Sequence, residues 1–195
     1  MKQVLLILPR GFEELEAAAF TDVFGWSRAE GIEPVGLVTA GLRDKVRCTW
    51  NFTVLPEHRL QDIDLDSFDA LALPGGFEEE GFYEDAFDER ILETVRAFHH
   101  AGKWIAAVCV GALCLGRAGI LEGKRATTYH LSGGHRRRQL AQYGANVVDE
   151  RIVEDHRILT STAPETALDV AFRLLERLTG PENTAVVRRE MGYRD

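Results

Sequence analysis

The sequence has no long hydrophobic run. Its N-terminal apolar run, Val4–Leu8, spans five residues and stops at Pro9-Arg10-Gly11. A membrane-spanning helix needs about 18–20 apolar residues, and the apolar core of a secretory signal is also longer than this run. We therefore interpret the run as a buried strand. We expect a cytoplasmic protein that has no contact with a membrane.

Cysteine is also scarce, and the 23 basic residues are outnumbered by 31 acidic ones. Three cysteines, an odd number without framework spacing, exclude a disulfide scaffold and favour a reducing compartment. The six histidines show no metal-ligand spacing with them, so we predict no metal site. The net charge of −8 argues against non-specific nucleic-acid binding. Neither a Walker motif nor G-x-G-x-x-G follows a strand, so no nucleotide cofactor is expected.

Apolar strand-like runs alternate with helix-like stripes along the whole chain. This alternation predicts an α/β fold with a mostly parallel sheet and helices on both faces. No repeat or linker interrupts it, so we predict a single domain over residues 1–195. We expect strands near residues 4–8, 34–39, 69–73, 104–108, 125–128, 147–148, 152–153 and 158–159, a hairpin over 46–55, and helices near 12–29, 85–101, after 109, and over 164–178 and 182–190.

Cys109 lies between an apolar run, residues 104–108, and a stretch of small residues that begins a helix. A nucleophile on a sharp strand-to-helix turn needs small neighbours, which Ala107, Gly111 and Ala112 supply. The partial positive charge of a helix N-terminus favours a thiolate there. The alternative is that Cys109 is a small core residue, as most free cysteines are.

Glu16 is the candidate acid of the first loop. At about 100° per residue it lies about 60° from the centre of an apolar stripe, whereas Glu13 and Glu14 lie about 120–140° away. The latter two are therefore interpreted as ordinary first-turn acids. Burial at the edge of the stripe raises the pKa of Glu16 and suits it to proton transfer, unless it bends out to solvent. The stripe consists of Phe12, Leu15, Ala19, Val23 and Trp26.

Two further loops carry candidate residues. Gly75 and Gly76 follow a buried strand, where their N–H groups can point into a cavity as an oxyanion site, or simply form a tight turn. His130 ends the strand over 125–128 and is either a base for Cys109 or a structural histidine.

Three features are assigned no catalytic role. The basic run over residues 135–138 is interpreted as a solvated helix face that attracts an anionic substrate at most. Cys114, about 500° beyond Cys109 around a helix, is assigned to packing. Cys48, on the small hairpin, is expected to be exposed as a secondary oxidation site.

Taken together, the motifs resemble those of the ThiJ/PfpI superfamily, a class I glutamine amidotransferase-like group. The likeness is greatest to the branch that contains the Parkinson-linked protein deglycase and bacterial ThiJ-like proteins. It extends in matching order from residue 2 to about 178. The segments that carry it are Gly11-Phe-Glu-Glu-Leu-Glu16, Leu73-Pro-Gly-Gly76 and Ile105-Ala-Ala-Val-Cys109-Val-Gly111.

The resemblance implies a flavodoxin-like sandwich that forms a homodimer and needs no cofactor. It implies that Cys109 is the nucleophile on an elbow and that Glu16 shares a hydrogen bond with its sulfur. The backbone amides of Gly75, Gly76 and Val110 would bind the oxyanion.

Two positions depart from the pattern of these relatives, which often carry Thr-Thr-His where this chain has Thr-Thr-Tyr129 and then His130. Adjacent side chains of a strand point in opposite directions. Either Tyr129 replaces the imidazole, or a bulge turns His130 toward Cys109. Protease-like relatives also have His directly after the cysteine, where this chain has Val110, which makes peptidase activity less expected.

Three functions remain open from the sequence. The first is a cysteine enzyme of the glyoxalase or deglycase type in stress response, acting on methylglyoxal or on glycated protein. Cys109 would form a hemithioacetal, and Glu16 would move the proton that yields a hydroxy acid. The second is a redox sensor or chaperone that acts through oxidation of Cys109. The third is an amidase, peptidase or isonitrile-hydratase-like hydrolase.

Overall fold

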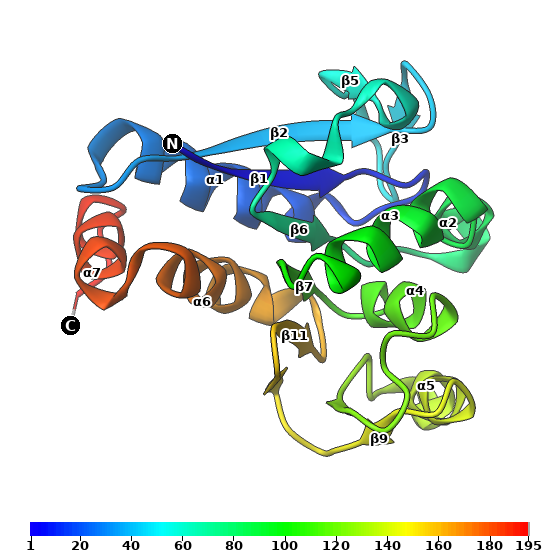
Figure 1. Ribbon diagram of the computed structural model, residues 1–195. Coiled ribbons are helices and arrows are strands. Elements are labelled where there is room, and N and C mark those ends of the chain that lie inside the picture. The colour runs from blue at the N-terminus through cyan, green and yellow to red at the C-terminus, as the bar shows by residue number, and fades with distance from the viewer. Residues whose placement is uncertain (195) are drawn as a thin grey trace.

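A seven-stranded sheet forms the centre of the protein (Figure 1). The computed structural model describes residues 1–194. The strand order is β10-β11-β7-β6-β1-β2-β5, and every neighbouring pair is parallel except β10 and β11. This sheet confirms the predicted α/β, flavodoxin-like class. The bounds are β1 (Lys2–Ile7), β2 (Val35–Gly41), β5 (His58–Arg59), β6 (Ala70–Leu73), β7 (Trp104–Ala107), β10 (Ile152–Asp155) and β11 (Ile158–Ser161).

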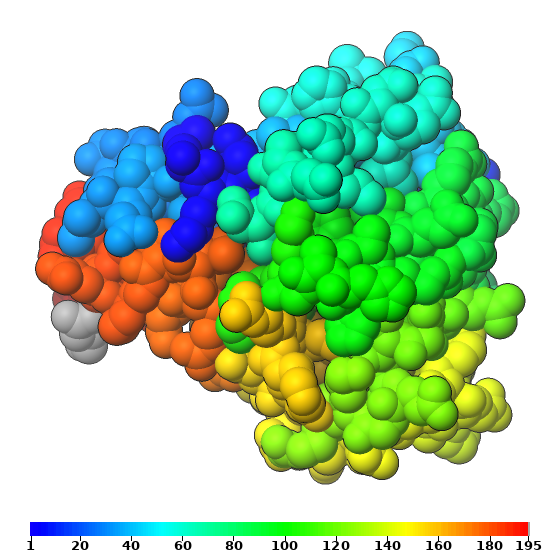
Figure 2. Space-filling model, in the orientation of Figure 1, coloured from blue at the N-terminus to red at the C-terminus, as the bar shows by residue number. Residues whose placement is uncertain are grey.

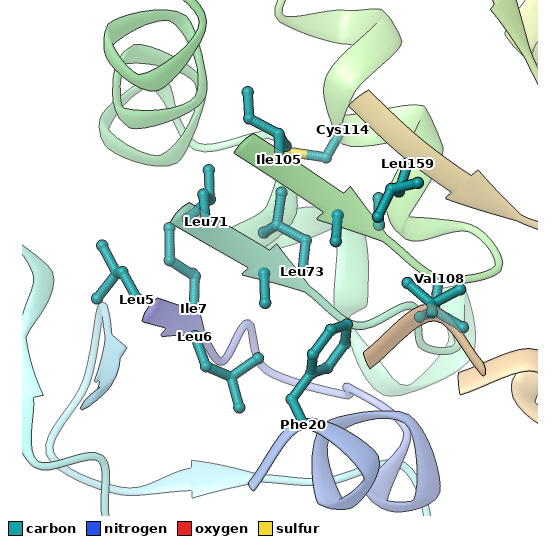
Figure 3. Packing of buried hydrophobic residues seen from close by; sticks show 14 of the residues in the cluster. Leu5, Leu6, Ile7, Phe20, Leu71, Leu73, Ile105, Val108, Cys114 and Leu159 are labelled. Atoms are coloured by element: carbon teal, nitrogen blue, oxygen red, sulfur yellow. The ribbon is translucent and has the colours of Figure 1, made fainter. Parts of the chain in front are cut away.

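Helices cover both faces of the sheet. One group joins α1, α6 and α7, and the other places α3 and α4 on β7. Figure 3 shows Phe20 of α1 and Cys114 of α4 on opposite sides of the central strands. The bounds are α1 (Glu14–Glu30), α2 (Phe82–Ala86), α3 (Glu89–His100), α4 (Gly111–Arg117), α5 (His135–Gln142), α6 (Ala167–Thr179) and α7 (Pro181–Glu190).

The central strands are buried on both faces, which explains their continuous apolar sequences. Leu5, Leu6, Leu71 and Ile105 are fully buried in one hydrophobic cluster (Figure 3). The strand register also fixes the site, because Leu73 pairs with Ala107 and the loops after β6 and β7 therefore start side by side. Ligands of such sheets bind at this edge, where the strands end.

The N-terminal and C-terminal parts of the described chain pack together, and in Figure 2 the blue residues lie beside the orange and red ones. Asn183 of α7 accepts a hydrogen bond from the backbone N–H of Glu33 at 3.1 Å and donates one to its carbonyl at 3.2 Å. The final helix thereby closes onto the turn before β2. No helix within residues 1–194 combines the length and the apolar composition that crossing a membrane requires.

Two small sheets lie outside the central one. The predicted hairpin is confirmed as the antiparallel pair β3 (Val46–Arg47) and β4 (Thr53–Val54). The strand predicted over 125–128 is shorter, as β8 (Arg125–Ala126), and pairs with β9 (Asn146–Val147).

Two sequence predictions about helices are wrong in detail. The helix expected over 85–101 is two helices, because Asp88 caps the N-terminus of α3 by accepting from the N–H of Arg90 at 3.0 Å. In α1, Leu15 and Trp26 are 55% and 41% exposed. The buried face of α1 instead runs through Glu16, Phe20, Val23 and Ser27, so the true stripe is rotated toward Glu16.

Candidate active site

Cys109 occupies a strained turn between β7 and α4, which confirms the predicted elbow. Its φ is +54°, a left-handed conformation that costs about 1–3 kcal/mol in residues other than glycine. The hydroxyl of Thr128 donates to its carbonyl at 2.8 Å. At Gly111 a Cβ atom would lie 2.8 Å from the carbonyl oxygen of Pro74, so only glycine lets α4 begin this close to β6.

Glu16 is fully buried directly behind this turn. Its carboxyl accepts a hydrogen bond from the N–H of Gly75 at 2.5 Å and a further one links it to Cys109. Burial is the main cause that raises its pKa to about 8. Oε1 of Glu16 has no nitrogen or oxygen partner among the described residues. Glu16 lies at the centre of the buried face of α1 rather than at its edge, so the predicted desolvation is larger than the stripe indicated.

The Cys109 thiol has a raised pKa, contrary to the stabilised thiolate expected from the sequence. The side chain is only 6% exposed, and burial raises the pKa well above its ordinary value. A negative charge on Glu16 raises it further, while the N–H of Val110 lowers it. The partial positive charge at the start of α4 therefore does not offset the rise in the thiol pKa that burial and the neighbouring acid cause. The site therefore holds Cys109 as a thiol next to a carboxyl that accepts a proton only in its ionised form, which predominates above about pH 8.

The backbone amides of Gly75 and Gly76 have different surroundings. The N–H of Gly75 is taken by Glu16, so it is not free for an oxyanion, although a Cβ there would lie 2.9 Å from the nitrogen of Val110. Gly76 lines the cavity beside Cys109, and a Cβ there would lie 2.1 Å from the carbonyl oxygen of Gly11. Gly76 and Val110 are the predicted oxyanion residues that reach the cavity.

The site opens into a cavity of about 290 Å³. Cys109 lines it, whereas the buried Glu16 does not. Acidic and basic side chains share its wall. The lining residues are Glu13, Gly76, Phe77, Glu78, Glu79, Cys109, Val110, Tyr129, Ser132, His135, Arg136 and Pro164.

Tyr129, rather than His130, faces the cavity. Tyr129 is half-buried in its wall, while His130 is exposed and does not line it. Of the two arrangements left open by the sequence, the structure therefore shows the first. The rings of Tyr129 and His130 lie 6.4 Å apart, but only Tyr129 lines the cavity. The structure does not bring His130 to Cys109 as a base.

Two residues of the cavity were missed by the sequence analysis. Arg136 is 14% exposed, not solvated, because its guanidinium stacks on the ring of Tyr83 at 4.9 Å and pairs with Glu78 at 2.7 Å. Glu13, interpreted as an ordinary first-turn acid, is half-buried in the cavity wall. Burial, followed by the charge of Glu14, raises its pKa. No pattern in the sequence indicates that either residue lines the cavity, because their place in its wall depends on how the loops fold.

The other two cysteines are inert packing residues. The Cys114 thiol donates to the carbonyl of Ala86 at 3.0 Å, which confirms its packing role. The expectation that Cys48 is exposed is wrong, because the hairpin buries it completely, and burial raises its pKa to about 11. Residues 1–194 contain no group of three or more His, Cys, Asp or Glu side chains placed to hold a metal ion. Independence of cofactors stays a prediction.

Comparison with known proteins agrees with this geometry. The model of the DJ-1/PfpI family matches residues 2–177. Protein dj-1beta of Drosophila melanogaster is 31% identical over 192 residues, covering 96% of this chain and 95% of that protein. Its crystal structure superimposes with a TM-score of 0.87 at 28% identity, covering 100% and 99% of the two chains.

Two further relatives have names that state an activity. The glutathione-independent glyoxalase DJR-1.2 of Caenorhabditis elegans is 27% identical over 189 residues, covering 93% of this chain and 90% of that protein. An isonitrile hydratase of Pseudomonas putida is 32% identical over 133 residues, covering 67% and 54%. The family match spans nearly the whole fold, including the elbow, the glycine loop and the buried acid. The chain belongs to the DJ-1/PfpI family.

Proposed function

We propose that the protein is a cofactor-independent cysteine enzyme that converts small 2-oxoaldehydes, such as methylglyoxal, into 2-hydroxy acids. The observation that carries this proposal is the hydrogen bond between the buried carboxyl of Glu16 and the Cys109 thiol, at the wall of a small cavity. A nucleophile, a proton acceptor and a free amide at one point suit addition to a carbonyl. The glyoxalase named among the relatives supports the same substrate class.

The reaction begins with addition of the thiol to the aldehyde. The Cys109 sulfur forms a bond to carbon 1, Glu16 accepts the thiol proton, and that proton then passes to the new alkoxide. The N–H of Gly76 stabilises the oxyanion while it exists. A proton shift from carbon 1 to carbon 2 converts the hemithioacetal into a thioester, which water hydrolyses. Carbon 1 is oxidised as carbon 2 is reduced, so the balance needs no redox cofactor.

The direct test is conversion of methylglyoxal to lactate by the purified protein without glutathione or added metal. We expect turnover by the wild type and none by Cys109→Ser, whose hydroxyl is a far weaker nucleophile. Glu16→Gln should lower kcat by about 10²–10⁴-fold, because it removes the acceptor of the thiol proton. Full activity in Cys109→Ala would exclude the mechanism.

Redox sensing through oxidation of Cys109 is a second candidate function. The carboxyl of Glu16, which is already hydrogen-bonded to the sulfur, can also hydrogen-bond a sulfinate oxygen. Mass spectrometry after mild peroxide treatment tests this role. A selective gain of two oxygens at Cys109 supports sensing, and its absence argues against it. The burial and raised pKa of the thiol favour the enzyme, since thiolates oxidise more readily than thiols.

We also infer a homodimer. The hairpin region leaves Trp50, Phe52 and Leu55 exposed, and Leu15 of the neighbouring helix α1 is exposed as well. Apolar side chains gathered at one site are typical of a protein interface. Light scattering should give about twice the chain mass of 21.8 kDa. Phe52→Glu should shift the mass toward the monomer, and a monomeric wild type would contradict the inference.

A further inference from the structure

Three acids line the cavity, Glu13, Glu78 and Glu79, and Glu16 is not among them. Glu13 lines the cavity together with Cys109. Glu16 is fully buried, absent from the cavity wall, and fixed by the N–H of Gly75. Its carboxyl therefore serves the sulfur and the atoms next to it. Because Cys109 and Glu13 line the same cavity, the remainder of a substrate bound to the sulfur would lie in the space that Glu13 borders.

Glu13 is held in place by both its backbone and its side chain. Its N–H donates to the carbonyl of Gly75 at 2.9 Å, and its own carbonyl accepts from the N–H of Glu16 at 3.1 Å. Its carboxyl hydrogen-bonds to the side chain of Trp50. The ring of Trp50 in turn packs 5.2 Å from that of Phe77. A catalytic acid needs this kind of support from its neighbours.

Glu13 also interacts electrostatically with the other two groups of the site. Its negative charge raises the pKa of both Cys109 and Glu16. Partial burial, followed by the charge of Glu14, raises its own pKa toward the range in which a carboxyl transfers protons efficiently near neutral pH. The charges of Cys109, Glu13 and Glu16 thus influence one another. Of these three residues, only Cys109 and Glu13 line the cavity.

We propose that Glu13 is a second catalytic acid, which carries the proton from carbon 1 to carbon 2 of the hemithioacetal. This inference rests on the proposed function and divides its proton transfers between two acids. The Glu13 carboxylate removes the hydrogen from carbon 1, and the electron pair of that bond forms a carbon–carbon double bond while the carbonyl pair of carbon 2 moves to its oxygen, which gives an enediolate. The same carboxyl then protonates carbon 2, and the proton of the carbon 1 hydroxyl passes to the oxygen on carbon 2 as the carbon–oxygen double bond of the thioester forms at carbon 1. Glu16 acts only on the proton of the sulfur and the first alkoxide.

The test compares Glu13→Gln with Glu30→Gln, which removes an equal charge from an exposed position at the other end of α1, outside the cavity. We expect Glu13→Gln to lower kcat for methylglyoxal by about 10²–10⁴-fold, the usual contribution of a general acid–base group. Glu30→Gln should stay within about threefold. Alkylation of Cys109 by iodoacetamide should be as fast in Glu13→Gln as in the wild type, or faster, because a neighbouring negative charge is lost.

Rescue by formate separates catalysis from folding. In Glu13→Ala the open cavity admits formate, which should restore at least tenfold of the lost rate. In Glu16→Ala the same formate should restore nothing, because that carboxyl is sealed from the cavity. Near-normal turnover by Glu13→Gln, or no rescue of Glu13→Ala, overturns the role of Glu13 while leaving the proposed function intact. A wild type that converts no 2-oxoaldehyde overturns both.

Discussion

At the scale of single residues, the ionisation of Glu16 controls the reaction. Only its carboxylate accepts the thiol proton, and burial raises its pKa to about 8. We expect kcat/KM for methylglyoxal to rise about tenfold per pH unit below pH 8 and to level off above it. Because Glu16 and Cys109 interact, the midpoint belongs to the pair. A profile that is flat between pH 6 and pH 9 would exclude Glu16 as the acceptor.

Gly75 is the residue on which the contact between acid and thiol depends. In Gly75→Ala the new Cβ would lie 2.9 Å from the nitrogen of Val110 and 3.0 Å from the carboxyl of Glu16. We expect a loss of about 1–3 kcal/mol in the free energy of unfolding, typical of overpacking, together with most of the activity. Urea unfolding and the methylglyoxal assay measure the two effects.

A matched control is Gly25→Ala in α1, where nothing lies within 4 Å of the added atom. Alanine is favoured over glycine inside a helix by about 1 kcal/mol, so this variant should be more stable and fully active. Equal stability losses in the two variants would contradict the close approach at Gly75.

Residues of the site differed in how far the sequence could predict them. Cys109 and Glu16 were predictable because a small-residue turn and a helical wheel depend on nearby positions only. Glu13 and Arg136 were not, since a helical wheel says nothing about a cavity wall built from several separate segments of the chain. The prediction that Cys48 is exposed was wrong for the same reason, because its side chain is buried by packing of the hairpin rather than by its own strand.

At the scale of elements, the segment after β8 holds the elbow in its strained conformation. The hydroxyl of Thr128 donates to the carbonyl of Cys109 at 2.8 Å. In Thr128→Val this buried carbonyl loses a partner, which costs about 1–3 kcal/mol. We expect thermal unfolding to show that loss, together with lower kcat, as Cys109 relaxes from its φ of +54°.

The neighbouring residue supplies the control for this prediction. The hydroxyl of Thr127 is buried without a hydrogen-bond partner in the described structure. Thr127→Val keeps the shape and removes an unsatisfied group, so it should be neutral or stabilising and retain activity. If both variants lost equal stability, the bond from Thr128 would have no special role.

The elements themselves were predicted well where the pattern was strong. The continuous apolar runs of β1, β6 and β7 predicted buried strands, and the structure confirms them. The stripe of α1 was misplaced because Leu15 and Trp26 are apolar yet exposed, while Glu16 is polar yet buried. Periodicity assigns apolar residues to the buried face of a helix and polar residues to the exposed face. A functional acid in the core does not follow that assignment.

At the scale of the whole molecule, Glu16 couples the chemistry to stability. Its pKa is about 8 in the folded protein, against an ordinary value of 4.5, so the folded state binds more protons between these pH values. Stability is therefore greatest below about pH 4.5 and falls as pH rises toward 8. The shift corresponds to a loss on the order of 5 kcal/mol, since each pKa unit is about 1.4 kcal/mol.

Glu16→Gln tests this coupling, because glutamine stays neutral at every pH and its amide oxygen still accepts from the N–H of Gly75. Urea unfolding at pH 5 and pH 8 should show a wild type that weakens across this range and a variant that does so far less. At pH 8 the inactive variant should be the more stable protein by about 2–5 kcal/mol. Parallel slopes for the two proteins would contradict the raised pKa. The expected difference would mean that the buried carboxyl of Glu16 is retained for its role in the reaction although it lowers the stability of the folded protein, as is common for active-site groups.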